Sequence, residues 1–454
     1  DDPNADPILA QIGVGRNVIE GDTPNLTSTE SAVVNNDSWQ LAFYAQDEWD
    51  LASNLTLSLG LRWSAEPGHL NNDFVMPEEF ATKLREAGVP DSFIAEGDRQ
   101  DDLDNFAPRI RFSWDLFGTG RTTLSGGFAR SFDRPPANDV DREQREANWL
   151  VHTVIFNNAP FLPDEVRPSF PDPTENPEEL RELVVSGAAN LQPDITLLDR
   201  DIEHPVVDDY SIGIRQQLTS TIRASVNLVA KNTRHGFGSW NFNPLQEGVR
   251  SETAEFGNIL LASDFWDRQY RALLFTVRRQ YQDDWMFQFN YALSKLNTDV
   301  MRPSSPQPFE GVSGAGDERH RFTINGIYNL PWGFRVSGFA TLASPTPLNA
   351  TDGRDLNGDG SFDNDFLGGE PFNFRPDGFD SWYRKVDLRL TKNITYRGAQ
   401  VELLAEFFNV LNTDNYSDYF TRRRDADGTL LSRFGEPISA FEPRRIQFGA
   451  RVSF

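Results

Sequence analysis

The chain contains no cysteine, which excludes disulfide frameworks, thiolate metal sites and thiol catalysis. It also lacks any apolar run approaching the roughly 20 residues that a membrane-spanning helix needs. The first residues show no charged-then-apolar signal segment. They read DDPNADPILAQIG, which is typical of the middle of a protein. We therefore expect that a preceding segment has been removed by processing or truncation.

Positive charge is also scarce. The 43 Lys and Arg residues face 68 Asp and Glu residues, so that the formal net charge is −25. Nucleic acid is not an expected partner, because phosphate binding requires clustered Lys and Arg. The favoured interpretation of the acidic surplus is solubility, and it also fits acidic loops in a cation-rich layer at a cell surface.

Aromatic residues, by contrast, are abundant. They make up 12% of the chain, with 35 Phe and 10 Trp, yet the mean hydropathy is −0.52. A soluble domain this rich in aromatics would usually carry more aliphatic residues as well. A protein wall with one face in lipid and the other in water combines many apolar positions with a polar average.

Segments of about 10–12 residues with alternating apolar and polar side chains recur along the chain. In Leu55–Trp63 the leucines and the tryptophan share one face, and Ile222–Leu228 and Trp285–Tyr291 repeat the pattern. This length suits a tilted strand that crosses a bilayer. The pattern predicts an all-β, antiparallel transmembrane β-barrel with about thirteen strands present. They lie near Trp39–Leu51, Leu55–Ala65, Arg109–Leu116, Arg121–Phe132, Val207–Leu218, Thr221–Lys231, Gln269–Gln280, Trp285–Lys295, Arg319–Leu330, Phe334–Ala343, Tyr383–Ile394, Gln400–Val410 and Arg444–Phe454.

The connections between these segments alternate between short turns and long, acidic loops. This alternation is typical of outer-membrane barrels, whose periplasmic turns are short and whose extracellular loops are long. The long connections are Glu66–Pro108, Asp133–Val206, Asn232–Arg268, Leu296–Glu318, Ser344–Trp382 and Leu411–Pro443. Within two of them, Pro77–Arg85 and Pro177–Val184 have helical spacing, an initial proline and acidic residues in the first turn, which predicts short helices.

The order of turns and loops also predicts orientation. The last strand, Arg444–Phe454, follows a long loop, so it should run from the outside to the periplasm. Counting back thirteen strands makes residues 1–38 the remnant of an extracellular loop and residues 39–454 the barrel strands. Because bacterial single-chain barrels have an even number of strands, we expect an incomplete barrel.

Three segments resemble known sequence signatures. The last strand resembles the outer-membrane insertion signal, in which apolar residues alternate and the chain ends on an aromatic; Phe448, Val452 and Phe454 carry this likeness. Val401–Asn412, with its Phe-Asn-Val-Leu-Asn run, resembles the penultimate strand of TonB-dependent receptors. Arg319–Phe322, followed by a strand and Pro331–Gly333, is similar to the Oar-like branch of that family, whose members often carry a carboxypeptidase-regulatory-like domain.

The resemblance implies a barrel of 22 strands filled by an amino-terminal plug that engages TonB. This chain would supply the last thirteen strands and lack the plug. The implied function is uptake of a bulky nutrient, such as a siderophore, glycan or peptide, and not enzymatic catalysis. The implied partners are outer-membrane lipid and lipopolysaccharide, the barrel-assembly machinery, TonB through the plug, and the nutrient. The alternatives are a barrel that binds or supports without transport and, less favoured by the long loops, a porin.

One loop has the pattern of a cation site. Asp355–Asp365 places oxygen-bearing side chains at alternate positions with glycines between them, and calcium requires such oxygen ligands on a tight turn. The expected ligands are Asp355, Asn357, Asp359, the Ser361 carbonyl and Asp363. Phe366 occupies the position of the bidentate glutamate of an EF-hand, so Asp365 would have to substitute. The interpretations are a structural Ca²⁺ that braces the loop, or an acidic loop without metal.

No arrangement of catalytic residues stands out. The five histidines are scattered and show no ligand spacing. Polar residues of the strands are expected to line the lumen or contact a plug: Arg62, Arg111, Arg215, Arg223, Lys231, Gln288, Asn290, Lys385, Asp387, Arg389, Glu402 and Glu406. Aromatic residues in or beside the outer loops could grip a ligand or pack the loops together, and packing is the favoured interpretation. They are Trp149, Phe156, Phe161, Trp240, Phe242, Trp266 and Phe374.

Overall fold

The computed structural model describes residues 8–15, 36–156, 194–246, 249–359 and 361–454. Thirteen strands follow one another by antiparallel pairing in the main sheet, as the alternating segments predicted. They are β2 Leu41–Ala52, β3 Leu55–Ala65, β4 Phe106–Asp115, β5 Thr122–Phe132, β8 Val206–Gln217, β9 Ile222–Asn241, β12 Ile259–Gln282, β13 Trp285–Arg302, β15 His320–Leu330, β16 Phe334–Ala343, β17 Tyr383–Tyr396, β18 Ala399–Phe408 and β21 Arg445–Ser453.

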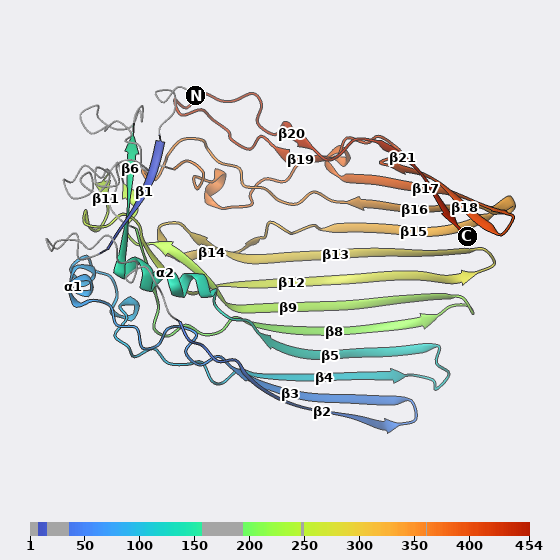
Figure 1. Ribbon diagram of the computed structural model, residues 1–454, viewed down its shortest axis with the longest axis horizontal. Helices are drawn as coiled ribbons and strands as arrows, with labels where there is room; N and C mark the ends of the chain where they lie inside the picture. Colours follow the sequence, from blue (N-terminus) through green and yellow to red (C-terminus); the bar gives the residue numbers. More distant parts are fainter. Residues whose placement is uncertain (1–7, 16–35, 157–193, 247–248, 360) are drawn as a thin grey trace.

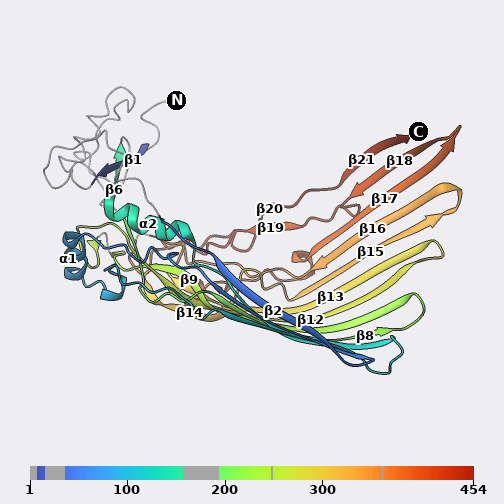
Figure 2. The same ribbon diagram turned by 60° about the horizontal axis from the view of Figure 1, so that its bottom comes forward.

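The sheet is open among the described residues. It is one continuous wall with β2 at one edge and β21 at the other (Figure 1). Seen from a second direction, the wall curves like a trough, and the loops gather at one end of it (Figure 2). Among the described residues β2 pairs only with β3, and β21 pairs only with β18, so the outer side of each edge strand has unpaired backbone groups. Such edges are templates for further strands.

The strand register separates the two faces of the wall. On one face apolar residues lie opposite each other from strand to strand, as in Ile110 beside Phe128, and Phe128 beside Tyr210. Because successive side chains of a strand point to opposite faces, the other face carries polar residues such as Arg389, which lies opposite Glu406. The apolar face is the one that suits lipid, and the polar face suits a water-filled lumen.

Short turns join the strands at the end opposite the long loops. One two-residue turn is Gln282–Trp285, where Asp283 and Asp284 have φ values of 51° and 70°. Two consecutive left-handed residues match the right-handed twist of the flanking strands, and aspartate tolerates this conformation better than most side chains. The predicted periplasmic turns are therefore present where expected.

Three strands extend further than predicted at the loop end. The sequence pattern ended β9 at Lys231, began β12 at Gln269 and ended β13 at Lys295, but β9 reaches Asn241, β12 begins at Ile259 and β13 reaches Arg302. The predicted loops 232–268 and 296–318 are thus partly strand. Beyond the bilayer a strand no longer needs an apolar face in lipid, so the alternation that revealed it disappears while backbone pairing continues.

Most of the smaller elements lie at the loop end (Figure 1), whereas the 3₁₀ turn Pro331–Gly333 joins β15 to β16 at the opposite end. The helix predicted at Pro77–Arg85 is confirmed as α1 Glu78–Glu86, whereas the one predicted at Pro177–Val184 lies outside the described residues. Within the described residues, no helix is long and apolar enough to span a membrane. The remaining elements are β1 Ile8–Gly15, α2 Ala137–Asn148, β6 Trp149–Phe156, β7 Ile195–Leu198, β10 Leu245–Gln246, β11 Val249–Arg250, β14 Ser305–Ser313, β19 Tyr416–Tyr419, β20 Pro437–Ala440, and the 3₁₀ turns Asp91–Phe93, Pro331–Gly333, Leu367–Gly369 and Phe379–Ser381.

Candidate functional site

The extracellular loops fold together into what we call the cap, formed by residues 66–105, 133–147, 194–205 and 232–268. Its hydrophobic core joins α1, the end of α2, β7 and the start of β12. Phe80 of α1 meets Phe256 edge-on at 5.4 Å, and the side chains of Leu84, Ile195 and Ile259 are fully buried. Loops far apart in sequence therefore form one packed unit above the sheet rather than separate flexible segments.

A buried ion pair crosses the centre of the cap. Arg99 donates two parallel hydrogen bonds to Glu143, of 2.6 and 2.7 Å, and the side chains are only 2% and 0% exposed. Arg99 also donates to the carbonyl oxygens of Leu70 and Leu198, while Glu143 accepts from the Leu198 amide at 3.0 Å. The two-pronged geometry suits a guanidinium and a carboxylate. It connects α2 and β7 to the preceding loop.

A second polar contact joins the base of the cap to the start of β8. The His204 ring nitrogen Nδ1 lies 2.6 Å from Asp102 Oδ2, and the His204 amide donates to the same oxygen at 3.0 Å. Burial alone would raise the pKa of Asp102. The hydrogen bonds and the charge of His204 outweigh burial and hold this pKa well below its usual range.

Charged side chains pair on both faces of the wall. Near the extracellular ends of β5, β8 and β9, on the same face as Phe128 and Tyr210, Asp208 accepts hydrogen bonds from Arg130 at 2.7 Å and from Arg234 at 3.0 Å. On the polar face, Arg389 pairs with Glu406. The lumen-lining residues predicted from the sequence share the polar face. Some of them are paired there, as in Lys231 with Asp209 on the neighbouring strand and Lys385 with Asp387 on the same strand.

The Asp-rich loop forms a compact turn held by its own side chains. Asp355 Oδ1 accepts from the amides of Gly358 and Asp359 at 2.7 and 3.2 Å. Asp359 Oδ1 accepts from the Ser361 amide, while its Oδ2 accepts from the side-chain amide of Asn357. The side chains predicted as calcium ligands thus lie near one another. Within the described residues, however, no three carboxylate or imidazole groups are arranged to hold a metal ion.

Asp365 differs from its neighbours in this loop. It is 7% exposed, and its Oδ2 is buried with no hydrogen-bond partner among the described residues. Burial, and then the nearby charges of Asp355 and Asp359, raise its pKa, although backbone hydrogen bonds from Leu356 and Asn357 oppose the shift. The Asp365 carboxylate therefore lies in a negative environment that a cation would relieve.

The predicted insertion signal lies on the apolar face of the edge strand. Phe448 is opposite Ala405 of β18, and Val452 is opposite Val401. Phe448 is 77% exposed, Val452 is 54% exposed and Phe454 is fully exposed. Large apolar side chains at an open edge are suited to lipid or to an adjoining strand.

Several residues that organise this end of the molecule had no signal in the sequence. Arg99 and Glu143 are 44 residues apart, and Asp102 and His204 are 102 apart. Neither pair forms a motif, and only the folded loops bring the partners together. The aromatic residues Trp240 and Phe242 pack against the cap core, which confirms the packing interpretation for these two; Phe161 lies outside the described residues.

A family model described as an outer membrane beta barrel domain matches residues 17–384. The chain belongs to this outer-membrane β-barrel family. Its barrel domain accordingly lies in the outer membrane. No curated protein matches the sequence. The wall is similar to that of the outer membrane transporter YddB from Escherichia coli, with a TM-score of 0.55 and 11% identity over 91% of this chain and 45% of that one. It is also similar to the ferripyoverdine receptor of Pseudomonas aeruginosa, with a TM-score of 0.50 and 12% identity over 91% of this chain and 38% of that one. The chain thus spans less than half of either solved protein.

Proposed function

We propose that this chain is the barrel part of a TonB-dependent outer-membrane receptor that takes up a bulky nutrient. The observation that carries the proposal is the thirteen-strand wall itself, apolar on one face and polar on the other, with a folded extracellular cap. A transporter and a siderophore receptor of the outer membrane share its arrangement. A wall of this curvature, completed by further strands along β2 and β21, encloses a lumen wide enough for a plug and a large ligand.

The cap and the polar face supply the surfaces that such uptake needs. The cap core and the Arg99–Glu143 pair hold the loops in one arrangement, so ligand contacts on them would be preorganised. The polar face offers both signs of charge, which suits a hydrated ligand such as a siderophore, glycan or peptide. Membership of the Oar-like branch remains a prediction from the Arg319–Phe322 segment.

The second candidate is a barrel that binds at the cell surface or supports the envelope without transport. The folded cap fits that role equally well, since a rigid surface is sufficient for binding. The two candidates differ in whether the protein engages the energy-transducing system of the inner membrane.

Binding of the periplasmic domain of TonB tests the choice. The full-length protein would be purified in detergent and titrated with the TonB domain of the same organism by biolayer interferometry. Saturable binding that a peptide with the receptor's TonB-box sequence abolishes supports the transport proposal. Absence of binding, together with a reading frame that encodes no plug domain, would overturn it in favour of the non-transporting barrel.

We also propose that the Asp-rich loop binds Ca²⁺ in a structural role. Support comes from the motif and from the buried, unpartnered Asp365 Oδ2 beside Asp355 and Asp359. The ion would be held by Asp355, Asn357, Asp359, Asp363 and the Ser361 carbonyl, with Asp365 in place of the missing glutamate. Binding requires Asp359 to exchange its contact with Asn357 for the ion.

A further inference from the structure

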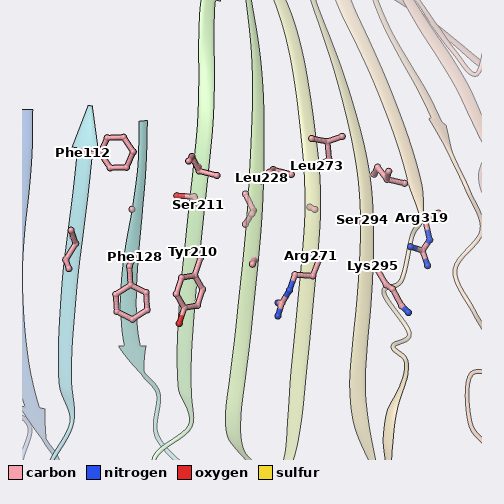
Figure 3. A pocket seen from close by; sticks show the side chains of 17 residues that line it. Phe112, Phe128, Tyr210, Ser211, Leu228, Arg271, Leu273, Ser294, Lys295 and Arg319 are labelled. Atoms are coloured by element: carbon pink, nitrogen blue, oxygen red, sulfur yellow. The ribbon is translucent and has the colours of Figure 1, made fainter. Parts of the chain in front are cut away.

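The strands β9 and β12 run from the wall into the cap through an irregular segment. Within the wall the two strands pair without interruption, and Figure 3 shows Leu228 of β9 beside Leu273 of β12 on this regular part. At its far end, β12 pairs with β7 through Ile259–Ala262, inside the cap. The irregular segment therefore connects the membrane-embedded wall to the cap.

This segment consists of two consecutive bulges, one on each strand. The pairing shifts by one residue on β12 between Ser263 and Trp266, and by one residue on β9 between Thr233 and Gly236. Bulges bend a strand and increase its local twist. In the bulge of β9, the backbone of His235 has a φ of 56°, a left-handed conformation that histidine tolerates better than most residues. The two strands thus bend at a defined place beside His235.

Trp266 packs closely against the bend from β12. Its ring covers Gly236, where a Cβ atom would lie 2.2 Å from the ring, and its indole nitrogen donates to the Phe237 carbonyl at 2.8 Å. The Arg268 guanidinium lies 5.1 Å from the ring centroid. Only glycine fits at position 236, so this close packing is a fixed feature of the bend.

The side chain of His235 connects three segments that meet at the bend. Its Nδ1 lies 2.8 Å from Oδ2 of Asp264 in the bulge of β12, and its Nε2 lies 3.3 Å from Oε2 of Glu203 in the connection between β7 and β8. Ionised carboxylates only accept hydrogen bonds, so a neutral ring, which has one N–H, can donate to one of them. The doubly protonated ring can donate to both and carries the opposite charge. In the described part of the chain, neither carboxylate has another cationic partner.

The other charged groups around the bend favour a protonated imidazole at this place. On β9, Arg234 is bound to Asp208 at 3.0 Å, so its charge is already neutralised. Ser263 Oγ lies within hydrogen-bond distance of both Asp199 and Asp264, at 3.2 and 2.9 Å. Asp199 therefore adds a further negative charge close to the Asp264 carboxylate.

We propose that His235 is an acid-sensitive clamp that holds the cap on the wall. Histidine is the side chain whose charge ordinarily changes between pH 5 and 8. Below this range the imidazolium binds Asp264 and Glu203 together, and the bend is closed. As the pH rises through the range, the ring loses a proton, one contact is lost, and the carboxylates are left with uncompensated negative charge. The cap then opens about the bend. This proposal rests on the folded cap and not on the proposed transport.

Hydrogen exchange of the full-length protein in detergent tests the clamp. Protection would be compared at about pH 5.5 and about pH 8, on either side of histidine titration, after correction for the intrinsic effect of pH on amide exchange. The informative peptides cover residues 233–241 and 259–268, and Leu55–Ala65 of the wall is the internal reference. The test variant His235→Asn cannot gain a charge but tolerates the left-handed backbone. The matched control is His320→Asn, because the His320 ring bonds the Tyr291 hydroxyl at 3.0 Å and has no carboxylate partner among the described residues.

In the wild type and the control, the bend should open about tenfold more often at the higher pH, because each of two partly exposed charge pairs contributes up to about fivefold. In His235→Asn the opening should be the same at both pH values and match the wild type at the higher pH. Equal opening of the wild type at the two pH values would overturn the proposal, and this comparison needs no variant. A pH dependence that persists in His235→Asn would also overturn it and would assign the effect to His204, the other histidine at the base of the cap. The same change in the Leu55–Ala65 peptides would overturn the assignment to a local bend.

Discussion

Replacing Glu143 by Gln should loosen the whole cap while leaving the sheet intact. The Glu143 carboxylate is completely buried and accepts two hydrogen bonds from Arg99 and one from the Leu198 amide. Its negative charge neutralises the positive charge of the Arg99 guanidinium. The variant leaves the Arg99 guanidinium buried without a counter-charge. Removing one partner of such a pair costs about 3–5 kcal/mol, which corresponds to a hundredfold to several-thousandfold increase in opening of the cap, in order of magnitude.

Hydrogen exchange of the full-length protein in detergent measures this opening directly. The informative peptides cover β7 and the start of β12, because Ile195–Leu198 pairs with Ile259–Ala262 in the cap. Their exchange should accelerate by the factor above, while peptides from Leu55–Ala65 in the sheet should be unchanged. Local opening of this kind exposes one cooperative unit and not the entire fold.

Two further variants separate charge from packing. Arg99→Met with Glu143→Met removes both charges, so it should recover much of the lost protection, as apolar replacements of buried pairs often do. Lys83→Met breaks an exposed pair with Glu255 at 3.4 Å and should cost less than about 1 kcal/mol. If the β7 and β12 peptides exchange in Glu143→Gln at rates within about threefold of the wild type, then leaving the Arg99 charge uncompensated does not destabilise the cap, and the prediction is refuted.

Three other predictions concern the loops and the last strand. Asp365→Asn should weaken Ca²⁺ binding measured by calorimetry at least about tenfold, since it removes a charged ligand, and Asp377→Asn outside the motif should not; absence of heat with the wild type would disprove the site. The pKa of Asp102 is lower in the folded than in the unfolded protein. The ionised Asp102 therefore stabilises the fold fully above the unfolded pKa, and this stabilisation is lost as the pH falls toward the folded pKa. The melting temperature of Asp102→Asn should therefore lie below that of the wild type at neutral pH, and the gap should narrow only below about pH 4; a gap that is constant with pH would contradict the assignment. Phe454→Gln should reduce the amount of heat-modifiable protein in outer-membrane fractions, whereas Ser453→Ala should not, because the exposed terminal ring and not the polar neighbour carries the predicted signal.

Much of the wall could be predicted from sequence because the bilayer imposes a pattern on it. A strand with lipid on one side and water on the other must alternate, so Leu55–Trp63 shows its strand directly, and short turns such as Gln282–Trp285 have recognisable residues. The extensions of β9, β12 and β13 could not be found this way, because no lipid contacts them there. The Arg99–Glu143 pair was equally hidden, since its partners meet only after the loops 66–108 and 133–206 have packed together.

The extracellular loops form packed groups, and this limits how they could move to admit a ligand. Beyond the cap, the loops 344–382 and 411–443 pack on each other: the Thr351 amide donates to the Thr421 carbonyl at 3.1 Å, and Phe374 meets Phe434 edge-on at 5.4 Å. Arg375 then joins this second group to Asp317, which is 1% exposed at the side chain. Because a loop that moved alone would leave buried polar groups without partners, movement that admits a ligand should involve these packed groups as units. Such a motion would have to preserve or replace the Arg375–Asp317 pair, because the Asp317 carboxylate is buried.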